Sequence, residues 1–155
     1  MAVFYSFYYK RDKMRVQQIL NMGVVEGQKV LNAQDWESVK AKGDKAIEDW
    51  IDRQMLHKQA VVVLVGKETA GRRWVRHEIL KAWNECRPLV GIRIHGLKDP
   101  KLGADAAGPN PFELIKLKNG LTIANYVQLH DPGTDAYKGI SSNLKTWVAG
   151  AYKRS

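Results

Sequence analysis

The run AVVVLVG at residues 60–66 constrains the fold more than any other part of the sequence. It holds four valines and a leucine without a polar residue, so it lacks the alternation of a strand with one face in water. A strand of this kind is covered on both faces, as in parallel sheets whose crossover helices pack on either side. The run therefore predicts a central strand of an α/β protein.

The rest of the chain alternates between strand-like and helix-like segments around this central run. Further strands are expected at residues 2–9, around Val30 and Leu31, at 88–96 and at 121–129. Helices are expected at residues 14–22, 44–56, 69–85 and 137–153. The alternation predicts an α/β fold, with a parallel sheet of about five strands, helices on both faces and a single domain over residues 1–155.

The helix expected at residues 69–85 carries a carboxylate on its apolar side. Its apolar arc consists of Trp74, Val75, Ile79, Ala82 and Trp83. At about 100° per residue, Glu78 falls inside that arc. Acidic side chains are seldom buried unless they are paired or functional. Glu78 is therefore either half of an ion pair, with Arg73 or Arg76 as its partner, or a functional group.

Three loops are expected to meet near Glu78, because ligands of parallel α/β sheets bind beyond the carboxyl ends of the strands. They are SFYYKRD after the first strand, NAQDWE after the second and GKETAGRRW after the third. Structural roles are open for their side chains as well. Ser6, Tyr8 and Tyr9 could be edge-of-sheet residues. Asp35 could cap a helix, and Trp36 could anchor it.

Residues 66–71 have the spacing G-x-x-x-x-G after a strand, which is found in loops that bind nucleoside triphosphates. Such a loop continues with Lys and then Ser or Thr, whereas this chain continues with Arg72 and Arg73. A triphosphatase is therefore excluded. The start of a helix with two arginines still suits a diphosphate, and an ordinary turn with surface arginines is the alternative.

A formal net charge of +9 bears on the partners of the chain more than on its fold. The charge is compatible with a solvated basic surface, a nucleic acid or a phosphate-bearing small molecule. The sequence has neither zinc-finger spacing nor an aromatic ribonucleoprotein box, and its basic residues are spread along the chain. We therefore expect no nucleic-acid partner.

Several further classes of protein are excluded by what the sequence lacks. Cys86 is the only cysteine, so no internal disulfide can form and a cytoplasmic protein is expected. The four histidines show no metal-ligand spacing, so we expect no metal. No apolar run approaches the ~20 residues that span a bilayer, so we expect no membrane partner. The N-terminal stretch lacks the basic start of a signal peptide.

Five segments of the sequence, taken in order, resemble the bacterial TIR-like proteins of the Thoeris anti-phage defence system. They are VFYSFYYKRD, DWE, VVVLVGKETAGRRWVRHEI, PLVGIRIHGLKD and GPNPF, and they run from residue 3 to about residue 113. The block T-x-x-R-R-W-V-R-x-E-I is the most specific of them. Because these proteins belong to the Toll/interleukin-receptor (TIR) superfamily, the resemblance implies its flavodoxin-like sheet.

The resemblance also implies an enzyme that cleaves the bond between nicotinamide and ribose in NAD, with NAD as substrate and no cofactor. Thoeris members release a cyclic or otherwise modified ADP-ribose as a signal, which activates a separate effector protein. The family's catalytic glutamate matches Glu78. A phage-derived trigger and self-association are further expectations from the same source.

The remaining site residues are expected from the same matching. The substrate-binding set is Ser6, Phe7, Tyr8, Asp35, Trp36, Thr69, Arg72, Arg73 and Trp74. For Arg72 and Arg73, together with Arg76, contacts to the diphosphate or to a neighbouring subunit are our own inference from the residues and not part of the matching. The alternative from another class is a non-enzymatic TIR-like adaptor that acts through protein–protein contacts. A receiver-like signalling domain is disfavoured, because the first strand lacks the adjacent acidic pair of a phospho-acceptor site.

Overall fold

The computed structural model describes residues 2–155 and contains one sheet of five parallel strands. The strands are β1 (Ala2–Ser6), β2 (Glu26–Gly27), β3 (Val61–Val65), β4 (Leu89–Arg93) and β5 (Leu129–His130). Their order across the sheet is β2-β1-β3-β4-β5. This is the order of flavodoxin-like doubly wound folds, so the predicted fold class is confirmed.

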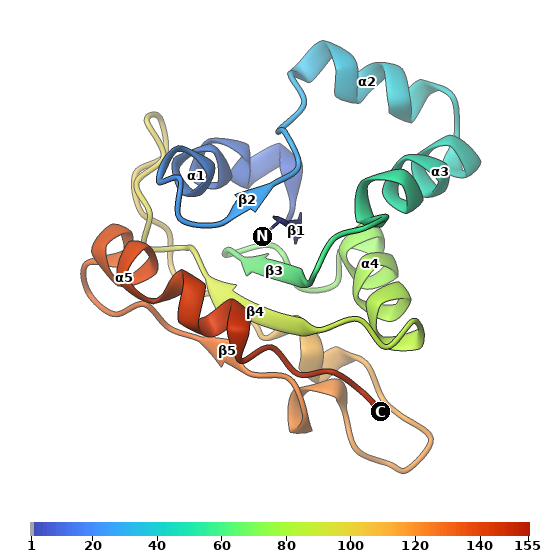
Figure 1. The fold of residues 1–155 in the computed structure, drawn as a ribbon. Helices are drawn as coiled ribbons and strands as arrows, with labels where there is room; N and C mark the ends of the chain where they lie inside the picture. The colour runs from blue at the N-terminus through green and yellow to red at the C-terminus, as the bar shows by residue number, and fades with distance from the viewer. Residues whose placement is uncertain (1) are drawn as a thin grey trace.

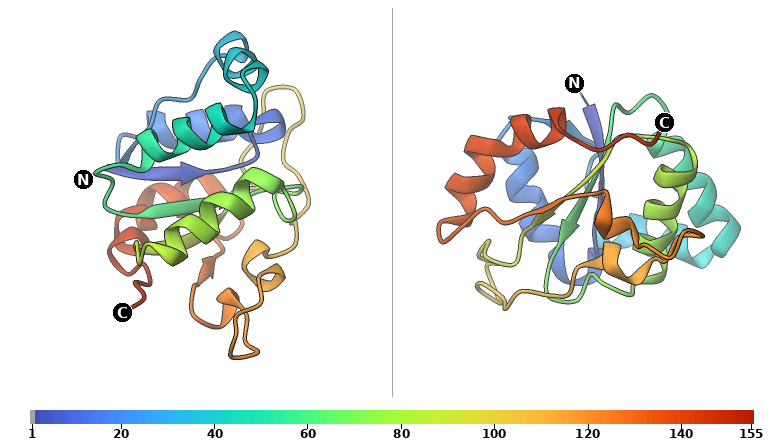
Figure 2. Two further views of the ribbon diagram at one scale, coloured as in Figure 1. Left: turned by 90° about the vertical axis from the view of Figure 1, so that its right-hand side faces the viewer. Right: turned by 90° about the horizontal axis from the view of Figure 1, so that it is seen from below.

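Helices cover both faces of this sheet (Figures 1 and 2). They are α1 (Tyr9–Asn21), α2 (Ala33–Ala41), α3 (Asp44–Met55), α4 (Arg73–Asn84) and α5 (Ala136–Ala149), with two short 3-10 helices, η1 (Pro111–Leu114) and η2 (Ile123–Asn125). Helices α1 and α5 lie on one face, α3 and α4 lie on the other, and α2 projects at the periphery. Among residues 2–155, no helix combines the length and hydropathy needed to cross a membrane.

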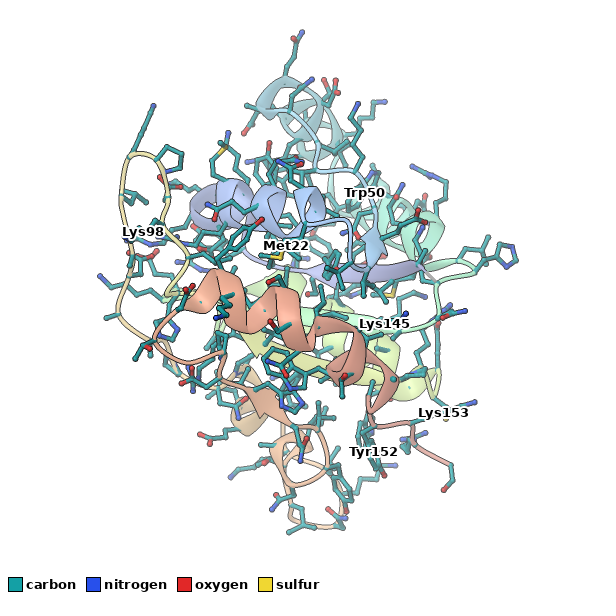
Figure 3. All side chains as sticks on the ribbon, turned by 60° about the vertical axis from the view of Figure 1, so that its left-hand side comes forward. Met22, Trp50, Lys98, Lys145, Tyr152 and Lys153 are labelled. Carbon is teal, nitrogen blue, oxygen red and sulfur yellow. The ribbon has the colours of Figure 1, made fainter. Side chains whose placement is uncertain are left out.

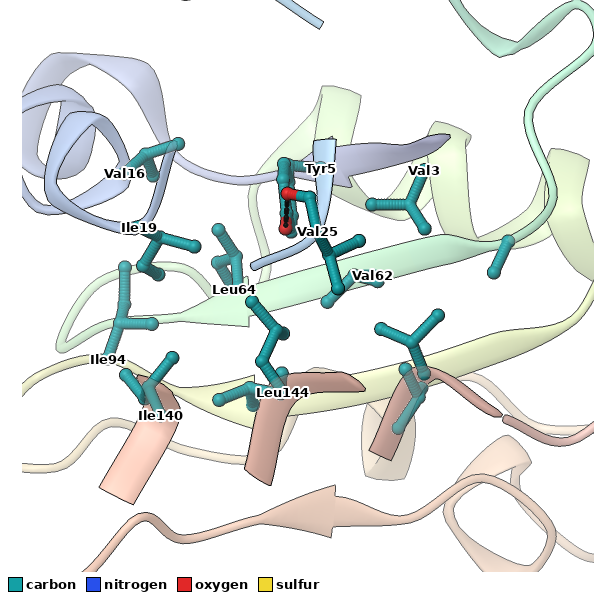
Figure 4. Packing of buried hydrophobic residues seen from close by; sticks show 14 of the residues in the cluster. Val3, Tyr5, Val16, Ile19, Val25, Val62, Leu64, Ile94, Ile140 and Leu144 are labelled. Carbon is teal, nitrogen blue, oxygen red and sulfur yellow. Dashed lines mark hydrogen bonds between the residues drawn. The ribbon is translucent and has the colours of Figure 1, made fainter. Parts of the chain in front are cut away.

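The central strand β3 is buried along its whole length, as the apolar run predicts. Val62 and Leu64 pack into the core beneath α1 and α5 (Figure 4). Val61, Val63 and Val65 pack into the core beneath α3 and α4. Successive side chains of a strand point to opposite faces, so a sheet with helices on both sides needs apolar residues at every position of its central strand.

The second strand differs from the sequence-based expectation. It consists of Glu26 and Gly27 rather than the residues around Val30 and Leu31. The Gln28 side chain continues the pairing with β1. Its Oε1 accepts from the Tyr5 backbone N at 2.8 Å, and its Nε2 donates to the Tyr5 O at 2.6 Å. A side-chain amide thus replaces the next backbone pair, and the chain leaves the sheet.

Three further predictions differ from the structure. The first strand ends at Ser6, and Tyr9 already begins α1. Asp35 and Trp36 lie in helix α2 and not in a polar loop, because Asn32 caps that helix by accepting from the Asp35 backbone N at 2.8 Å. The strand expected at 121–129 contributes only its last residue to β5, since a capping box at Thr122 starts η2 instead.

A buried ion-pair cluster fixes the loop after β4 to helix α1. Arg15 is fully buried, and its guanidinium donates to Asp12 Oδ1 at 2.7 Å, to the Leu97 O at 2.8 Å and to the Gly103 O at 2.7 Å. Asp105, from the same loop, lies 3.1 Å from Arg15. Every guanidinium nitrogen therefore has an acceptor, which is the condition under which a charge can be buried.

Candidate active site

Glu78 lies in the second turn of α4 and is 7 % exposed. Its carboxylate accepts a hydrogen bond from the Ser6 hydroxyl at 2.6 Å, and Ser6 is the last residue of β1. Within residues 2–155, Glu78 makes no ion pair with a basic side chain. Arg73 pairs with Asp44 at 2.5 Å, and Arg76 donates to the Leu114 O at 3.3 Å. The ion-pair interpretation of Glu78 is therefore wrong.

The environment of Glu78 disfavours its charge. Burial raises the pKa of its carboxyl from the ordinary 4.5 to about 8, and the hydrogen bond from Ser6 opposes part of that rise. A carboxyl group of this kind holds its proton near neutral pH while the pocket is empty. A cation in the pocket would favour the ionised form and release the proton. A strongly shifted acid at the ligand edge of the sheet is a mark of a functional site.

A small aromatic pocket surrounds the Glu78 carboxylate. Its lining consists of Phe4, Tyr5, Phe7, Tyr9, Gln28, Trp36, Trp50, Ile51, Trp74 and Glu78, and its volume is about 60 Å³. Three ring pairs close it on the outside, with centroids 6.3 Å apart for Phe7 and Tyr9, 5.4 Å for Tyr9 and Trp36, and 6.1 Å for Trp36 and Trp50. Aromatic faces beside a carboxylate suit a flat cationic ring, because both attract positive charge.

Helix α2 supplies the outer wall of the pocket. It buries none of its own residues, and its Trp36 reaches the pocket between Tyr9 and Trp50. A volume of about 60 Å³ corresponds to roughly two water molecules, so a dinucleotide cannot enter while α2 holds this position. The junction of α2 with α3 is Gly43, at a φ of 93°, which favours glycine.

A second hollow adjoins the pocket and shares Tyr9 with it. It has a volume of about 490 Å³ and lies between α1 and the segment that leads into α2. Its lining includes Lys13, Lys29 and Asp35. The first turn of α2 therefore lines both cavities, with Trp36 in the aromatic pocket and Asp35 in the larger hollow.

Five of the predicted site residues come together at the pocket. They are Ser6, Phe7, Trp36, Trp74 and Glu78, with Ser6 present through its hydrogen bond to the carboxylate. The apolar pattern of the sequence did not single out Tyr9, Trp50 or Gln28 as site residues. Trp50 lies in the helix expected at residues 44–56, and only its place opposite Trp36 shows that it lines the pocket.

The other predicted residues lie outside the pocket. Arg72 stacks over the Tyr8 ring, with the guanidinium carbon 3.9 Å from the ring centroid, and lies 3.3 Å from Glu68. Thr69 is buried and uses its hydroxyl to accept from the Gly66 backbone N at 2.7 Å, which shapes the turn before α4. The side chain of Asp35 is exposed at the start of α2.

In the part of the chain that the structure describes, no group of three or more His, Cys, Asp or Glu side chains could hold a metal ion. The pocket offers a single carboxylate among aromatic rings.

Fold and site together define a class of protein. It is a flavodoxin-like α/β domain with a buried carboxylate at its ligand edge. Residues 4–99 match the family model described as "Thoeris protein ThsB, TIR-like domain". The chain belongs to this family, which confirms the resemblance seen in the sequence.

A curated relative agrees with this family. The Bacillus cereus (strain MSX-D12) protein named "Putative cyclic ADP-D-ribose synthase ThsB1" is 33% identical over 118 residues. The aligned region covers 73% of this chain and 62% of the relative. The chain thus matches somewhat less than two thirds of the relative's length.

Proposed function

We propose that this protein cleaves the nicotinamide–ribose bond of NAD and releases a cyclic or otherwise modified ADP-ribose. The observation that carries the proposal is Glu78, a buried carboxylate without a basic partner in residues 2–155, enclosed by aromatic rings at the carboxyl edge of the sheet. The family and the printed name of the B. cereus relative support the same substrate and product class.

The chemistry fits one carboxylate. When the glycosidic C–N bond breaks, its electron pair moves to the pyridinium nitrogen, so nicotinamide leaves as a neutral molecule and needs no general acid. The ribosyl fragment becomes an oxocarbenium-like cation, and a fixed carboxylate stabilises the developing charge. The cation is then captured by water or a ribose hydroxyl, which loses a proton, or by the lone pair of an adenine nitrogen. Glu78 could also hold the ribose hydroxyls.

The aromatic rings would act before the bond breaks. The nicotinamide ring of NAD is cationic, so the faces of Trp36, Trp50 and Trp74 would hold it beside Glu78. Substrate entry would require Trp36 and α2 to move outward. Such a movement has a small cost in buried surface, since α2 buries none of its residues.

The diphosphate would lie at the start of α4, where Arg72 and Arg73 are placed. Both arginines are engaged in exposed ion pairs, with Glu68 and Asp44 respectively. Exposed pairs contribute only about 0–1 kcal/mol, so a diphosphate could displace either acid. Charge-assisted bonds to phosphate are stronger than such pairs.

The family supports a wider role. We place the protein in an anti-phage response, where its nucleotide product would activate a separate effector and a phage component would trigger its activity. Self-association is part of the same proposal. Cys86 is unpaired, which suits a reducing cytoplasm.

The test is nicotinamide release from NAD in two settings, with purified protein alone and with protein added to lysate of phage-infected cells. We expect release by the wild-type protein in infected lysate and release slower by about two to three orders of magnitude with Glu78→Gln. Mass spectrometry of the same samples would identify the ADP-ribose product. NAD that stays intact in infected lysate would contradict the proposal.

One observation favours a second candidate, the non-enzymatic adaptor. The pocket holds only about 60 Å³ with α2 in place, which suits a protein that binds partners and turns over no substrate. The infected-lysate experiment separates the two candidates, because an adaptor leaves NAD intact under every condition.

A further inference from the structure

A third hollow, much larger than the Glu78 pocket, lies at the opposite edge of the sheet. Its volume is about 630 Å³, and its principal lining residues are Trp83, Lys116, Lys118, Tyr126, Tyr152 and Arg154, which we call the aromatic–basic groove. Tyr152 bridges to Leu89, the first residue of β4, through backbone bonds of 2.8 and 3.0 Å. The groove is therefore at the amino edge of the sheet, whereas Ser6 and Glu78 are at the carboxyl edge.

The floor of the groove is built from three mutually packed rings. Trp83 and Tyr152 stack with an interplanar angle of 15° and centroids 5.9 Å apart. Tyr126 packs against both, with a centroid distance of 5.6 Å to each. Trp83 is 8 % exposed, whereas the two tyrosines are half-buried and keep part of their surface open to the groove. Asn119 donates to the Tyr126 hydroxyl at 2.9 Å and so orients that ring.

Three cations surround this floor without compensating acids. No carboxylate lines the groove, and Lys116, Lys118 and Arg154 make no ion pair within residues 2–155. The guanidinium of Arg154 lies over the Trp83 ring, 5.4 Å from its centroid. Arginines elsewhere, such as Arg11 and Arg15, have acidic partners. The groove therefore combines aromatic surface with unneutralised positive charge.

We infer that the aromatic–basic groove binds a nucleotide at a site separate from the Glu78 pocket. The base stacks on the open surface of Tyr126 and Tyr152, and the phosphates contact Lys116, Lys118 and Arg154. Base stacking on aromatic side chains and charge-assisted bonds to phosphate are the two main sources of affinity in such sites. The volume is within the range of about 300–1,000 Å³ that is usual for small-molecule sites.

An acidic protein segment is the competing occupant, and the observations favour the nucleotide. The cations surround a floor of packed rings, and the Asn84 and Asn119 amides at the margin can bond the edge of a base. A carboxylate-rich peptide would use the charge and leave the rings without a flat partner.

The test follows the indole N–H signals of the five tryptophans by NMR during titration with ADP. The five are Trp36, Trp50, Trp74, Trp83 and Trp147, and Trp→Phe variants would assign their signals. Trp83 reports on the groove, three others report on the Glu78 pocket, and Trp147 on α5 is a reference. We expect a saturable shift of the Trp83 signal and none at Trp147.

A pair of double variants makes the test specific. Lys116→Ala/Lys118→Ala should weaken the ADP affinity, as measured by the Trp83 shift, at least tenfold. NAD turnover should stay unchanged. Lys138→Ala/Lys145→Ala removes two exposed lysines of α5 (Figure 3 labels Lys145 and Tyr152) and should leave ADP binding unchanged. All four lysines are exposed, so both variants should fold.

Three results would overturn the inference. They are a Trp83 signal that ADP does not move, equal ADP affinity in both double variants, and a Trp83 shift that inorganic pyrophosphate or polyglutamate produces at lower concentration than ADP. A Trp83 shift in a protein that never cleaves NAD would leave the inference intact and contradict only the proposed function.

Discussion

Asp12 and Glu78 are buried carboxylates on helices that cover opposite faces of the same sheet, and their surroundings differ. Asp12 on α1 is fully buried and bonds to the buried Arg15, which in turn satisfies the loop after β4. Glu78 on α4 has a serine hydroxyl and aromatic rings around it. Burial raises the pKa of both groups, but only for Asp12 does an arginine act against that rise. A buried acid with a basic partner is a structural element, whereas one that has only a hydroxyl donor, as Glu78 has within residues 2–155, is free to meet a cationic ligand.

The largest expected effect concerns the Asp12 side of this comparison. Arg15→Met should lower the free energy of unfolding by about 3–5 kcal/mol, because it leaves the Asp12 and Asp105 charges without their buried partner. Urea unfolding measures the change. The double variant Asp12→Asn/Arg15→Met should recover part of the loss. If Arg15→Met lowers the free energy of unfolding by less than about 1 kcal/mol, the Asp12–Arg15 pair contributes no more than an ordinary surface pair.

The second prediction concerns the Glu78 side. Glu78→Gln should lower NAD turnover by about two to three orders of magnitude, roughly 2.7–4 kcal/mol in the barrier, because the amide keeps the shape and loses the charge. Single-turnover assays in activated lysate measure this effect, and circular dichroism checks the fold. Turnover close to that of the wild type, or failure of the variant to fold, would contradict the assignment.

The third prediction is that folding stability depends on pH through the Glu78 carboxyl, and that Glu78→Gln removes this dependence. The Glu78 carboxyl has a pKa near 4.5 when unfolded and about 8 when folded, so the folded state binds the proton more tightly. Its contribution to stability is complete below pH 4.5 and is lost as pH rises towards 8, with a slope of at most about 1.4 kcal/mol per pH unit. Relative to wild type, Glu78→Gln should therefore gain stability from pH 5 to pH 8. An unchanged difference across that range would argue against a protonated Glu78.

The smallest expected effect tests whether Arg72 binds the diphosphate at the Glu78 site or only forms its ion pair with Glu68. Arg72→Ala/Arg73→Ala should weaken ADP-ribose binding at the Glu78 site at least tenfold, or about 1.4 kcal/mol, through lost diphosphate contacts. Calorimetry measures the affinity. Lys13→Ala/Lys29→Ala, in the adjoining hollow, is the matched control and should change it less than threefold. The reverse ranking would move the diphosphate to that hollow and return Arg72 to its ion pair with Glu68.

Local patterns in the sequence predict most of the sheet and its main helices. The apolar run at 60–66 becomes β3, and the stripes of residues 44–56 and 69–85 become α3 and α4. These segments are long and periodic, so the burial pattern of each is visible within its own residues. The second strand is missed because two residues carry no periodicity, and the Gln28 side chain continues the pairing in place of backbone.

The sequence by itself determined that Glu78 lies on the buried side of its helix, because helical periodicity is a local property. It could not decide between an ion pair and a functional carboxylate, since that depends on which side chains from distant segments reach the same point. Tertiary structure brings Ser6 to the carboxylate and directs Arg73 to Asp44. It also places Trp36 of α2 over the pocket, across a contact with Trp50 that no local pattern encodes.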